Sequence, residues 1–172
     1  MIIEVGWLQH HPRETEEFHL AEAMGDLELS GETIRFLEDV DVRLVLTNTG
    51  RIIVGKGRIR TVVELTCGRC LRPYTWPIAM DFDVQLVQEG ASVPPDMMET
   101  GDVLVIRDEE VDLEPLVIEN IIVSLPLARV CREDCRGFCP GCGADLAREA
   151  CRCQEQEVDP RWEALKVLLK NN

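Results

Sequence analysis

The sequence predicts a protein of the α+β class, with a small antiparallel β-meander or partly closed barrel, a helix, a cysteine-rich segment and a C-terminal helix. Three observations in the 172-residue chain lead to this prediction: runs of alternating apolar and polar residues, two stretches with apolar residues at helical spacing, and eight closely spaced cysteines. We expect an acidic β-rich domain with its closing helix in residues 1–125, and the cysteine-rich segment with the last helix in residues 126–172.

The predicted strands lie in the middle of the chain. Apolar and polar residues alternate over residues 40–46, a turn follows at Asn48–Thr49–Gly50, and the alternation resumes over residues 59–65, which predicts a hairpin. The cleanest period of two covers residues 78–86, with one apolar and one acidic face. Such strands, joined by short turns, favour an antiparallel sheet. Candidate edge strands are residues 2–5 and 18–20.

Two helices are expected, each with a proline in its first turn. The first follows Asp112 as N-cap, contains Pro115 and ends before Pro126. The second begins at Asp159–Pro160, where an N-cap residue is followed by proline. Residues 88–101 are rich in Gly, Ser, Pro and acidic residues, so we expect a mobile loop there. The apolar stripe of the last helix consists of Trp162, Leu165, Leu168 and Leu169.

The cysteines are spaced as ligands of a tetrahedral metal ion. Two thiolates separated by two residues can bind one ion from a single tight turn, and Gly143 after the third pair allows φ > 0 there. This pattern predicts structural Zn²⁺, as one or two ions. The predicted ligands are Cys67, Cys70, Cys131, Cys135, Cys139, Cys142, Cys151 and Cys153.

Disulfides are the competing explanation for an even number of cysteines, but they belong to oxidising compartments. The first twenty residues hold four glutamates and no apolar run typical of a signal peptide, and no stretch approaches the ~18 apolar residues of a spanning helix. We therefore expect a cytoplasmic protein with reduced thiols and no membrane contact. An iron-sulfur cluster and reversible redox chemistry remain as alternatives, although the spacing of Cys131, Cys135 and Cys139 misses the bacterial ferredoxin pattern.

The lengths of the loops between cysteines indicate which thiols would bind the same ion. Cys139, Cys142, Cys151 and Cys153 lie within fifteen residues and could close one site locally. The other four cysteines would then form a second site that joins the middle of the chain to its end. The alternative is a single zinc with unused thiols, of which Cys131 and Cys135 are the first candidates for buried apolar packing.

Charge is distributed unevenly along the chain. It carries 18 Lys and Arg against 32 Asp and Glu, a net charge of −14 that opposes nucleic-acid binding by the whole protein. One basic island surrounds the first cysteine pair and runs into two aromatic residues, a combination that can contact phosphates and stack bases. Ion pairing on a solvated face and a packed tryptophan are the simpler explanation. The candidate RNA contacts are Arg51, Lys56, Arg58, Arg60, Arg69, Arg72, Tyr74 and Trp76.

Residues suited to catalysis are few. The histidines are His10, His11 and His19, and none has the surroundings of a metal ligand or a catalytic triad. Gly55–Lys56–Gly57 is too short for a phosphate-binding loop. Four-thiolate zinc sites are closed and structural, so the sequence favours a protein that is not an enzyme.

Several of these segments together resemble one known family. They are Leu46–Gly50, Val63–Pro73, Asp112–Pro126, Cys135–Leu146 and Asp159–Trp162. The spacing and order of these segments resemble those of the YceD family, which comprises bacterial and plastid proteins called large ribosomal RNA subunit accumulation protein.

The resemblance implies a role in making or maintaining large-subunit ribosomal RNA, without a known catalytic activity. Combined with the charge, it favours an assembly factor whose acidic surface shields a basic ribosomal protein, with a large-subunit rRNA precursor as the other candidate partner. A zinc-thiolate redox sensor or regulatory binding module is the alternative function, and a hydrolase or nuclease ranks third.

Overall fold

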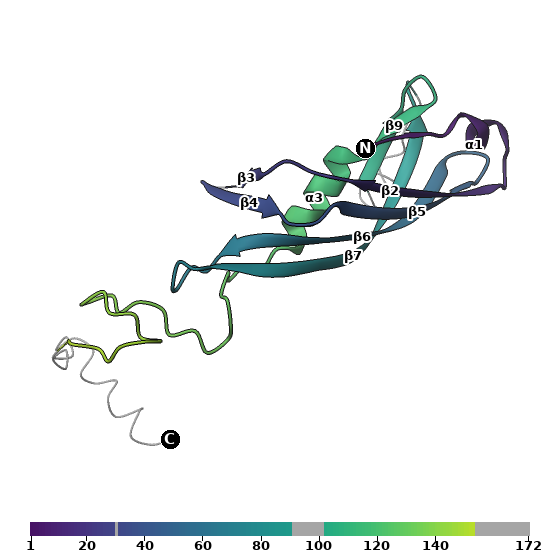
Figure 1. Cartoon of the computed structure of the whole chain (residues 1–172). Coiled ribbons are helices and arrows are strands. Elements are labelled where there is room, and N and C mark those ends of the chain that lie inside the picture. The colour runs from purple at the N-terminus through teal and green to yellow at the C-terminus, as the bar shows by residue number, and fades with distance from the viewer. Residues whose placement is uncertain (30, 91–101, 154–172) are drawn as a thin grey trace, which may run out of the picture. The chain divides into compact units, whose positions relative to one another are not determined.

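Figure 1 shows the computed structural model of the chain, in which residues 1–29, 31–90 and 102–153 are described. The chain divides into two compact units. The first, here called the strand unit, contains residues 1–66 and 73–129. The second, the cysteine unit, contains residues 67–72 and 130–172. Among the described residues, no helix combines the length and the apolar composition needed to cross a bilayer.

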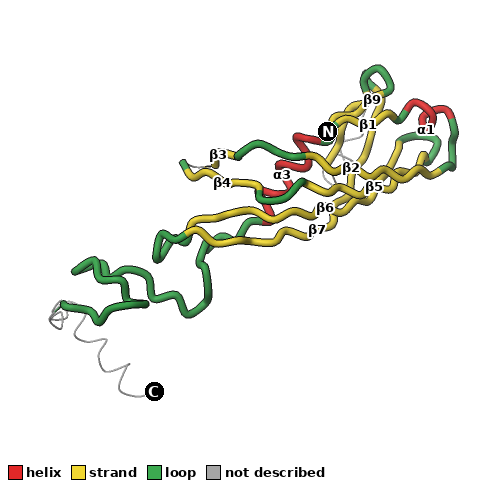
Figure 2. The backbone as a smooth tube through the Cα atoms, in the orientation of Figure 1, coloured by secondary structure: helices red, strands yellow, loops and turns green. Residues whose placement is uncertain are grey.

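Four long antiparallel strands form the main sheet of the strand unit (Figure 2). Along the central strands, Val42 lies opposite Ile59, which lies opposite Met80. These residues belong to the alternating runs, so the hairpin and the third strand expected from the sequence are confirmed, and the candidate edge strand near residue 18 is present. The strands are β2 (Thr15–Glu22), β5 (Val40–Asn48), β6 (Ile53–Thr66) and β7 (Pro73–Gln88).

Shorter strands extend this sheet and form a second one. β4 (Glu32–Phe36) pairs with the end of β6 and forms a hairpin with β3 (Leu27–Leu29). β8 (Asp102–Ile106) lies parallel to β7. β1 (Ile2–Glu4) and β9 (Glu110–Asp112) form a separate two-stranded sheet, and α1 (Gly6–His10) follows β1. The main sheet is open, because β2 and β8 each have a single strand neighbour among the described residues. The meander is therefore present, and the barrel expected as its alternative is not formed by these strands.

The predicted helix after Asp112 is present as α3 (Glu114–Ser124). The Asp112 carboxylate accepts a hydrogen bond from the Glu114 backbone N–H (2.9 Å), although Leu113 occupies the cap position itself. Leu125 is extended and Pro126 follows, as expected for a residue before proline. The second predicted helix, which begins at Asp159–Pro160, lies outside the described residues, as does the predicted loop of residues 88–101 from residue 91 onward.

The core lies between the inner face of the sheet, α3 and the small β1–β9 sheet. Each fully buried Leu, Ile or Phe stabilises the fold by about 1.5–3 kcal/mol. Position 57 requires glycine for a steric reason, because a Cβ there would lie 2.3 Å from Cζ of Phe82 on the neighbouring strand. The opposite face of the sheet carries charged residues, with Arg58 directly opposite Asp81. Large, fully buried side chains are Leu8, Ile34, Leu44, Leu46, Ile59, Leu65, Leu86, Leu113, Leu116 and Ile121.

Candidate metal centre

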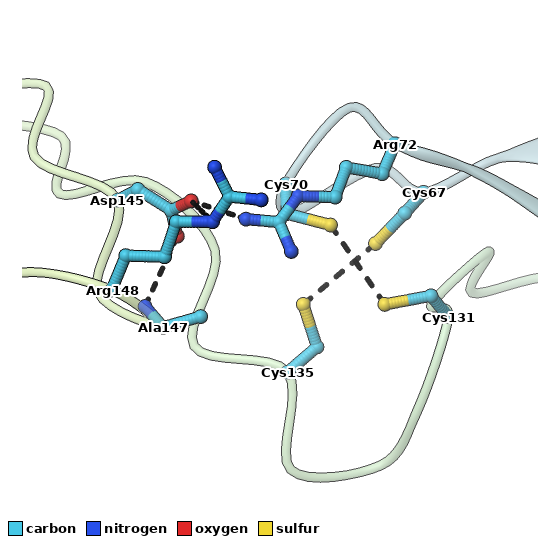
Figure 3. Close-up of polar contacts among 8 residues, drawn as sticks. All are labelled: Cys67, Cys70, Arg72, Cys131, Cys135, Asp145, Ala147 and Arg148. Atoms are coloured by element: carbon cyan, nitrogen blue, oxygen red, sulfur yellow. Dashed lines mark hydrogen bonds and ion pairs between the residues drawn. The ribbon is translucent and has the colours of Figure 1, made fainter.

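The first cysteine cluster brings together two segments of the cysteine unit that are about sixty residues apart in sequence (Figure 3). Cys67 and Cys70 lie in the tight connection from β6 to β7, and Cys131 and Cys135 lie in the segment that follows α3. The Sγ atoms of Cys67 and Cys135 are 3.8 Å apart, as are those of Cys70 and Cys131. All four sulfurs lie within 4.8 Å of one another.

These separations suit four ligands of one ion. Tetrahedral bonds of ~2.3 Å from a metal to sulfur place the sulfurs ~3.8 Å apart, whereas a disulfide would bring two of them to about 2 Å. All eight cysteines are free thiols. The cluster is also closed, because Cys67, Cys70 and Cys135 are each at most 4% exposed.

Backbone hydrogen bonds shape the connection that carries Cys67 and Cys70. The Cys67 N–H donates to the carbonyl of Arg72 (2.9 Å), and the N–H of Leu71 donates to the carbonyl of Cys67 (2.8 Å). Leu71 takes φ = 56°, an unusual value for leucine, which closes the turn. Both thiols are thereby presented from one short loop.

Contacts between the two segments hold the cluster together. The Phe138 N–H donates to the carbonyl of Arg69 (3.1 Å), and the Arg69 guanidinium donates to the carbonyl of Cys135 (2.8 Å). Arg72 forms an ion pair with Asp145, whose other oxygen accepts from the Ala147 N–H (3.1 Å) (Figure 3). Two arginines of the basic island therefore serve the architecture of this cluster.

The second cluster is local in sequence. The sulfur of Cys139 lies 3.4 Å from that of Cys151 and 3.6 Å from that of Cys153, and Cys142 lies 3.9 Å from Cys151. The Gly143 N–H donates to the Cys139 carbonyl (2.8 Å), and Gly143 has φ = 71° as its position after the pair predicted. Cys142, Cys151 and Cys153 are exposed, so this cluster is more open to solvent than the first.

The first cluster favours one thiolate at the expense of others. Burial raises the pKa of Cys67, but the backbone N–H groups of Cys131, Cys70 and Arg69 outweigh it and bring the value down to about 6. Burial and the neighbouring thiols raise the pKa of Cys131 to about 12. Four adjacent sulfurs thus repel further negative charge, and a divalent cation would offset that repulsion.

In the second cluster, too, the pKa of one thiol is lowered while that of another is raised. Backbone N–H groups of Ala144 and Arg152 lower the pKa of Cys142 to about 6. Hydrogen bonding to the neighbouring thiols raises the pKa of Cys153 to about 12. Both clusters therefore combine amide donors aimed at sulfur with a crowding of thiols, which is the environment of a thiolate metal site.

The difference in exposure leads to a prediction about metal release. If the zinc-loaded chain is treated with a strong chelator, we expect the ion of the second cluster to leave first, because water and chelator reach its three exposed thiolates. A chromogenic chelator should record two release phases. In a Cys142→Ser, Cys151→Ser chain, the fast phase should be missing and the slow phase unchanged. Equal rates of metal release from the two clusters would contradict the prediction.

Two of the predicted RNA contacts in the strand unit, Lys56 and Arg58, are paired with acidic neighbours on the solvent face. Arg58 binds Asp81 through two hydrogen bonds of 2.6 and 2.8 Å, and Lys56 lies 3.8 Å from Asp83. The bidentate contact lowers the pKa of Asp81 below its ordinary value. Exposed ion pairs of this kind contribute little to stability. Arg51 and Arg60 are exposed on the same unit.

The two aromatic residues of the predicted RNA surface face the other way. Tyr74 lies opposite Leu65 and Trp76 opposite Val63, and both rings pack against the core in an edge-to-face pair with centroids 6.5 Å apart. Basic and aromatic side chains therefore lie on opposite faces of the β6–β7 pair. The structure does not bring them together as one stacking surface.

Gly137 and Asp145 are supporting residues that the sequence prediction missed. A Cβ at Gly137 would lie 2.5 Å from the Arg69 carbonyl oxygen, and its φ is 66°. The available signal was a glycine placed between two ligands, Cys135 and Cys139. No comparable signal marked Asp145 as the partner of Arg72.

Comparisons with known proteins agree with the segments noted in the sequence. A family model described as "Large ribosomal RNA subunit accumulation protein YceD" matches residues 55–169. An uncharacterised protein of Mycobacterium tuberculosis is 33% identical over 172 residues, covering 98% of this chain and 81% of the relative. The uncharacterised YlbN protein of Bacillus subtilis is 25% identical, covering 96% of this chain and 94% of the relative.

A plant relative has a functional name. The chloroplastic maize protein named large ribosomal RNA subunit accumulation protein YCED homolog 1 is 27% identical, covering 59% of this chain and 44% of the relative. No solved structure matches the chain. The matched region of the family model begins in β6 and includes all eight cysteines.

Proposed function

Because the chain belongs to the YceD family of large ribosomal RNA subunit accumulation proteins, we propose that it is a non-enzymatic factor in ribosome assembly that promotes accumulation of large-subunit ribosomal RNA. The family match over residues 55–169 is the observation that carries this proposal. The names of the maize and Arabidopsis relatives support a ribosome-related role. A reducing compartment such as the bacterial cytoplasm suits eight free thiols.

We propose that the direct partner is a basic ribosomal protein. The strand unit contains nine Lys and Arg against 24 Asp and Glu, whereas the cysteine unit contains nine against eight. Phosphate groups would be repelled by the strand unit, and a cationic protein would be attracted to it. Contact with an rRNA precursor through the basic island is the weaker proposal, since Lys56, Arg58 and Arg72 already pair with carboxylates.

We propose that each cysteine cluster holds one zinc ion with a structural role. Sulfurs that all lie within 4.8 Å of one another suit a single ion. An iron-sulfur cluster would hold the four sulfurs farther apart as a group, because the thiolates are then divided between two or four irons. The ion would supply cross-links between segments, and the chain's own residues supply four thiolates per ion, which leaves no open position for a substrate.

Removal of the gene is the direct test of the function. Cells that lack the chain should show a lower ratio of large- to small-subunit rRNA, and the wild-type gene should restore it. The purified chain should also recover a large-subunit ribosomal protein from lysate. An unchanged ratio in the deletion cells, together with recovery of neither ribosomal protein nor rRNA precursor, would contradict the proposal.

A zinc-thiolate redox sensor is the second candidate, favoured by the exposure of Cys142, Cys151 and Cys153. It requires that peroxide release metal from the second cluster and change partner binding. Thiols that stay reduced under mild peroxide would remove this candidate.

A further inference from the structure

Two adjoining hollows on the strand unit share Asp108 and Glu110 in their linings. One has a volume of about 470 Å³ and the other about 290 Å³. They lie where β1, β9 and α1 meet, elements that Figure 2 shows next to one another. Together they form a groove, here called the β9 groove.

Part of the lining of the larger hollow is apolar. This part consists of Ile2, Val103, Leu104, Val105 and Pro115. Ile2 is 59% exposed and Val105 is 41% exposed, although both side chains are aliphatic. Exposed apolar side chains bordered by charged ones are typical of a protein interaction site.

The rest of the lining of the larger hollow, and most of that of the smaller one, is acidic. Among the described residues that line the two hollows, Arg107 is the one cation, and it lies 3.6 Å from the carboxylate of Glu89. Oε2 of Glu16 is buried and has no hydrogen-bond partner among the described residues. Burying a carboxylate oxygen without a hydrogen-bond donor costs free energy, so a cationic donor that enters this hollow would stabilise the Glu16 carboxylate. The acidic lining residues are Glu4, Glu16, Asp108, Glu109, Glu110 and Asp112.

The turn between β8 and β9 presents two of these carboxylates at a conformational cost. Asp108 and Glu109 have φ values of 49° and 67°, which type I′ turns usually assign to Asn and Gly. Reciprocal backbone hydrogen bonds between Arg107 and Glu110 (3.0 and 2.8 Å) close the turn. The Val5 N–H also donates to the Glu109 carbonyl (2.8 Å), which ties the turn to the start of α1.

Two further features suit a peptide-like ligand. Trp7 lines the acidic hollow and is 53% exposed, with its ring stacked on His11 at 4.4 Å between centroids. An exposed indole among carboxylates favours a guanidinium or ammonium group. β8 pairs with β7 along one edge, and along the other edge the described chain makes one bridge, between Arg107 just after β8 and Glu110 of β9. The rest of that edge has no strand partner among the described residues. An extended segment can add to such an edge.

We propose that the β9 groove binds an extended segment of a partner protein in which Arg or Lys alternates with aliphatic residues. The aliphatic side chains would pack on the apolar lining residues, and the cationic ones would reach the carboxylates and Trp7. This inference rests on the proposed function, for which it names the surface that receives the basic partner. Nucleic acid does not suit the groove, because its phosphates would face six carboxylates.

Binding of a defined peptide tests the groove. The probe is a fluorescein-labelled dodecapeptide of alternating arginine and valine, titrated with the full chain and followed by fluorescence anisotropy. The test variant carries Glu4→Gln, Asp108→Asn and Glu110→Gln. Its matched control carries Glu14→Gln, Glu38→Gln and Asp39→Asn, which remove the same charge from exposed positions outside the groove.

We expect the groove variant to bind at least about tenfold more weakly and to lose most of its salt dependence, whereas the control should change less than about threefold. Replacing valine by serine in the probe should also weaken binding. A separate variant with Asp108→Asn and Glu109→Gly should melt at a higher temperature yet bind more weakly, because it relaxes the turn and removes charge.

Equal affinities for the groove variant and its control would overturn the proposal, as would tighter binding of a labelled RNA oligonucleotide that the groove substitutions weaken. The rRNA ratio of deletion cells is measured independently. A normal ratio there contradicts the proposed function, while peptide binding reports on the groove itself.

Discussion

Replacing Cys67 by serine is expected to remove one metal ion per chain and to unfold the cysteine unit locally while the strand unit stays folded. Structural zinc contributes roughly 10–16 kcal/mol of binding energy that is available only to the folded site. Cys67 is fully buried and its sulfur lies 3.8 Å from that of Cys135. Without it, the two segments of the first cluster lose their cross-link.

Hydrogen exchange measures this effect residue by residue. Residues 130–138 should lose protection by several orders of magnitude, and the central strands β5 and β6 should keep theirs because their core is separate from the cluster. Cys153→Ser is the matched control, since it removes a ligand of the second cluster. If the Cys67→Ser chain still bound two ions and kept full protection from hydrogen exchange, the first cluster would not be a metal site.

Gly137→Ala is expected to weaken metal binding at the first cluster without changing a ligand. The added Cβ would lie 2.5 Å from the backbone oxygen of Arg69, which cannot move without shifting the loop that carries Cys67 and Cys70. The left-handed conformation adds a further cost of roughly 1–2 kcal/mol. Together these effects should lower the zinc affinity of this site by roughly a hundredfold or more.

Gly143→Ala provides the control for conformation alone. Gly143 has a similar φ of 71°, but nothing lies within 4 Å of a Cβ built there. Its affinity loss, at the second cluster, should be roughly tenfold. Competition with a zinc indicator measures both variants. Equal losses, or no loss in Gly137→Ala, would show that the close approach to Arg69 does not support the site.

The strands were predictable where one face is buried and the other is charged. Residues 40–46, 59–65 and 78–86 carry that alternation, and β5, β6 and β7 contain them. The short β3–β4 hairpin and the parallel strand β8 were not predicted, since each covers only three to five residues. A parallel neighbour also depends on tertiary topology, which a local pattern does not contain.

The basic island shows how linear proximity differs from position on a face. Side chains alternate between the faces of a strand, so residues close in sequence point in opposite directions. Arg58 and Arg60 occupy the exposed positions of β6, while Val63 and Leu65 are buried opposite Trp76 and Tyr74. Only the register of β6 against β7 separates the two groups, and the length of the connecting turn sets that register.

The two cysteine clusters differ in how far they can be predicted from residues that are close in sequence. The grouping of Cys139, Cys142, Cys151 and Cys153 followed from their short separation, which makes closure easy. The first cluster depends on the fold, because the β6–β7 turn and the segment after α3 must meet. Its supporting pair Arg72–Asp145 spans 73 residues, and single-sequence patterns contain no trace of such a pairing.

Native mass spectrometry of the freshly purified, reduced chain tests the central claim most directly. Two sites of four thiolates each predict a mass increase equal to two zinc ions per chain, with the protons of the thiols displaced. Acidification should return the mass to that of the metal-free chain. A native chain that carries no metal while residues 130–153 remain protected from hydrogen exchange would contradict the account, as would the mass of an iron-sulfur cluster.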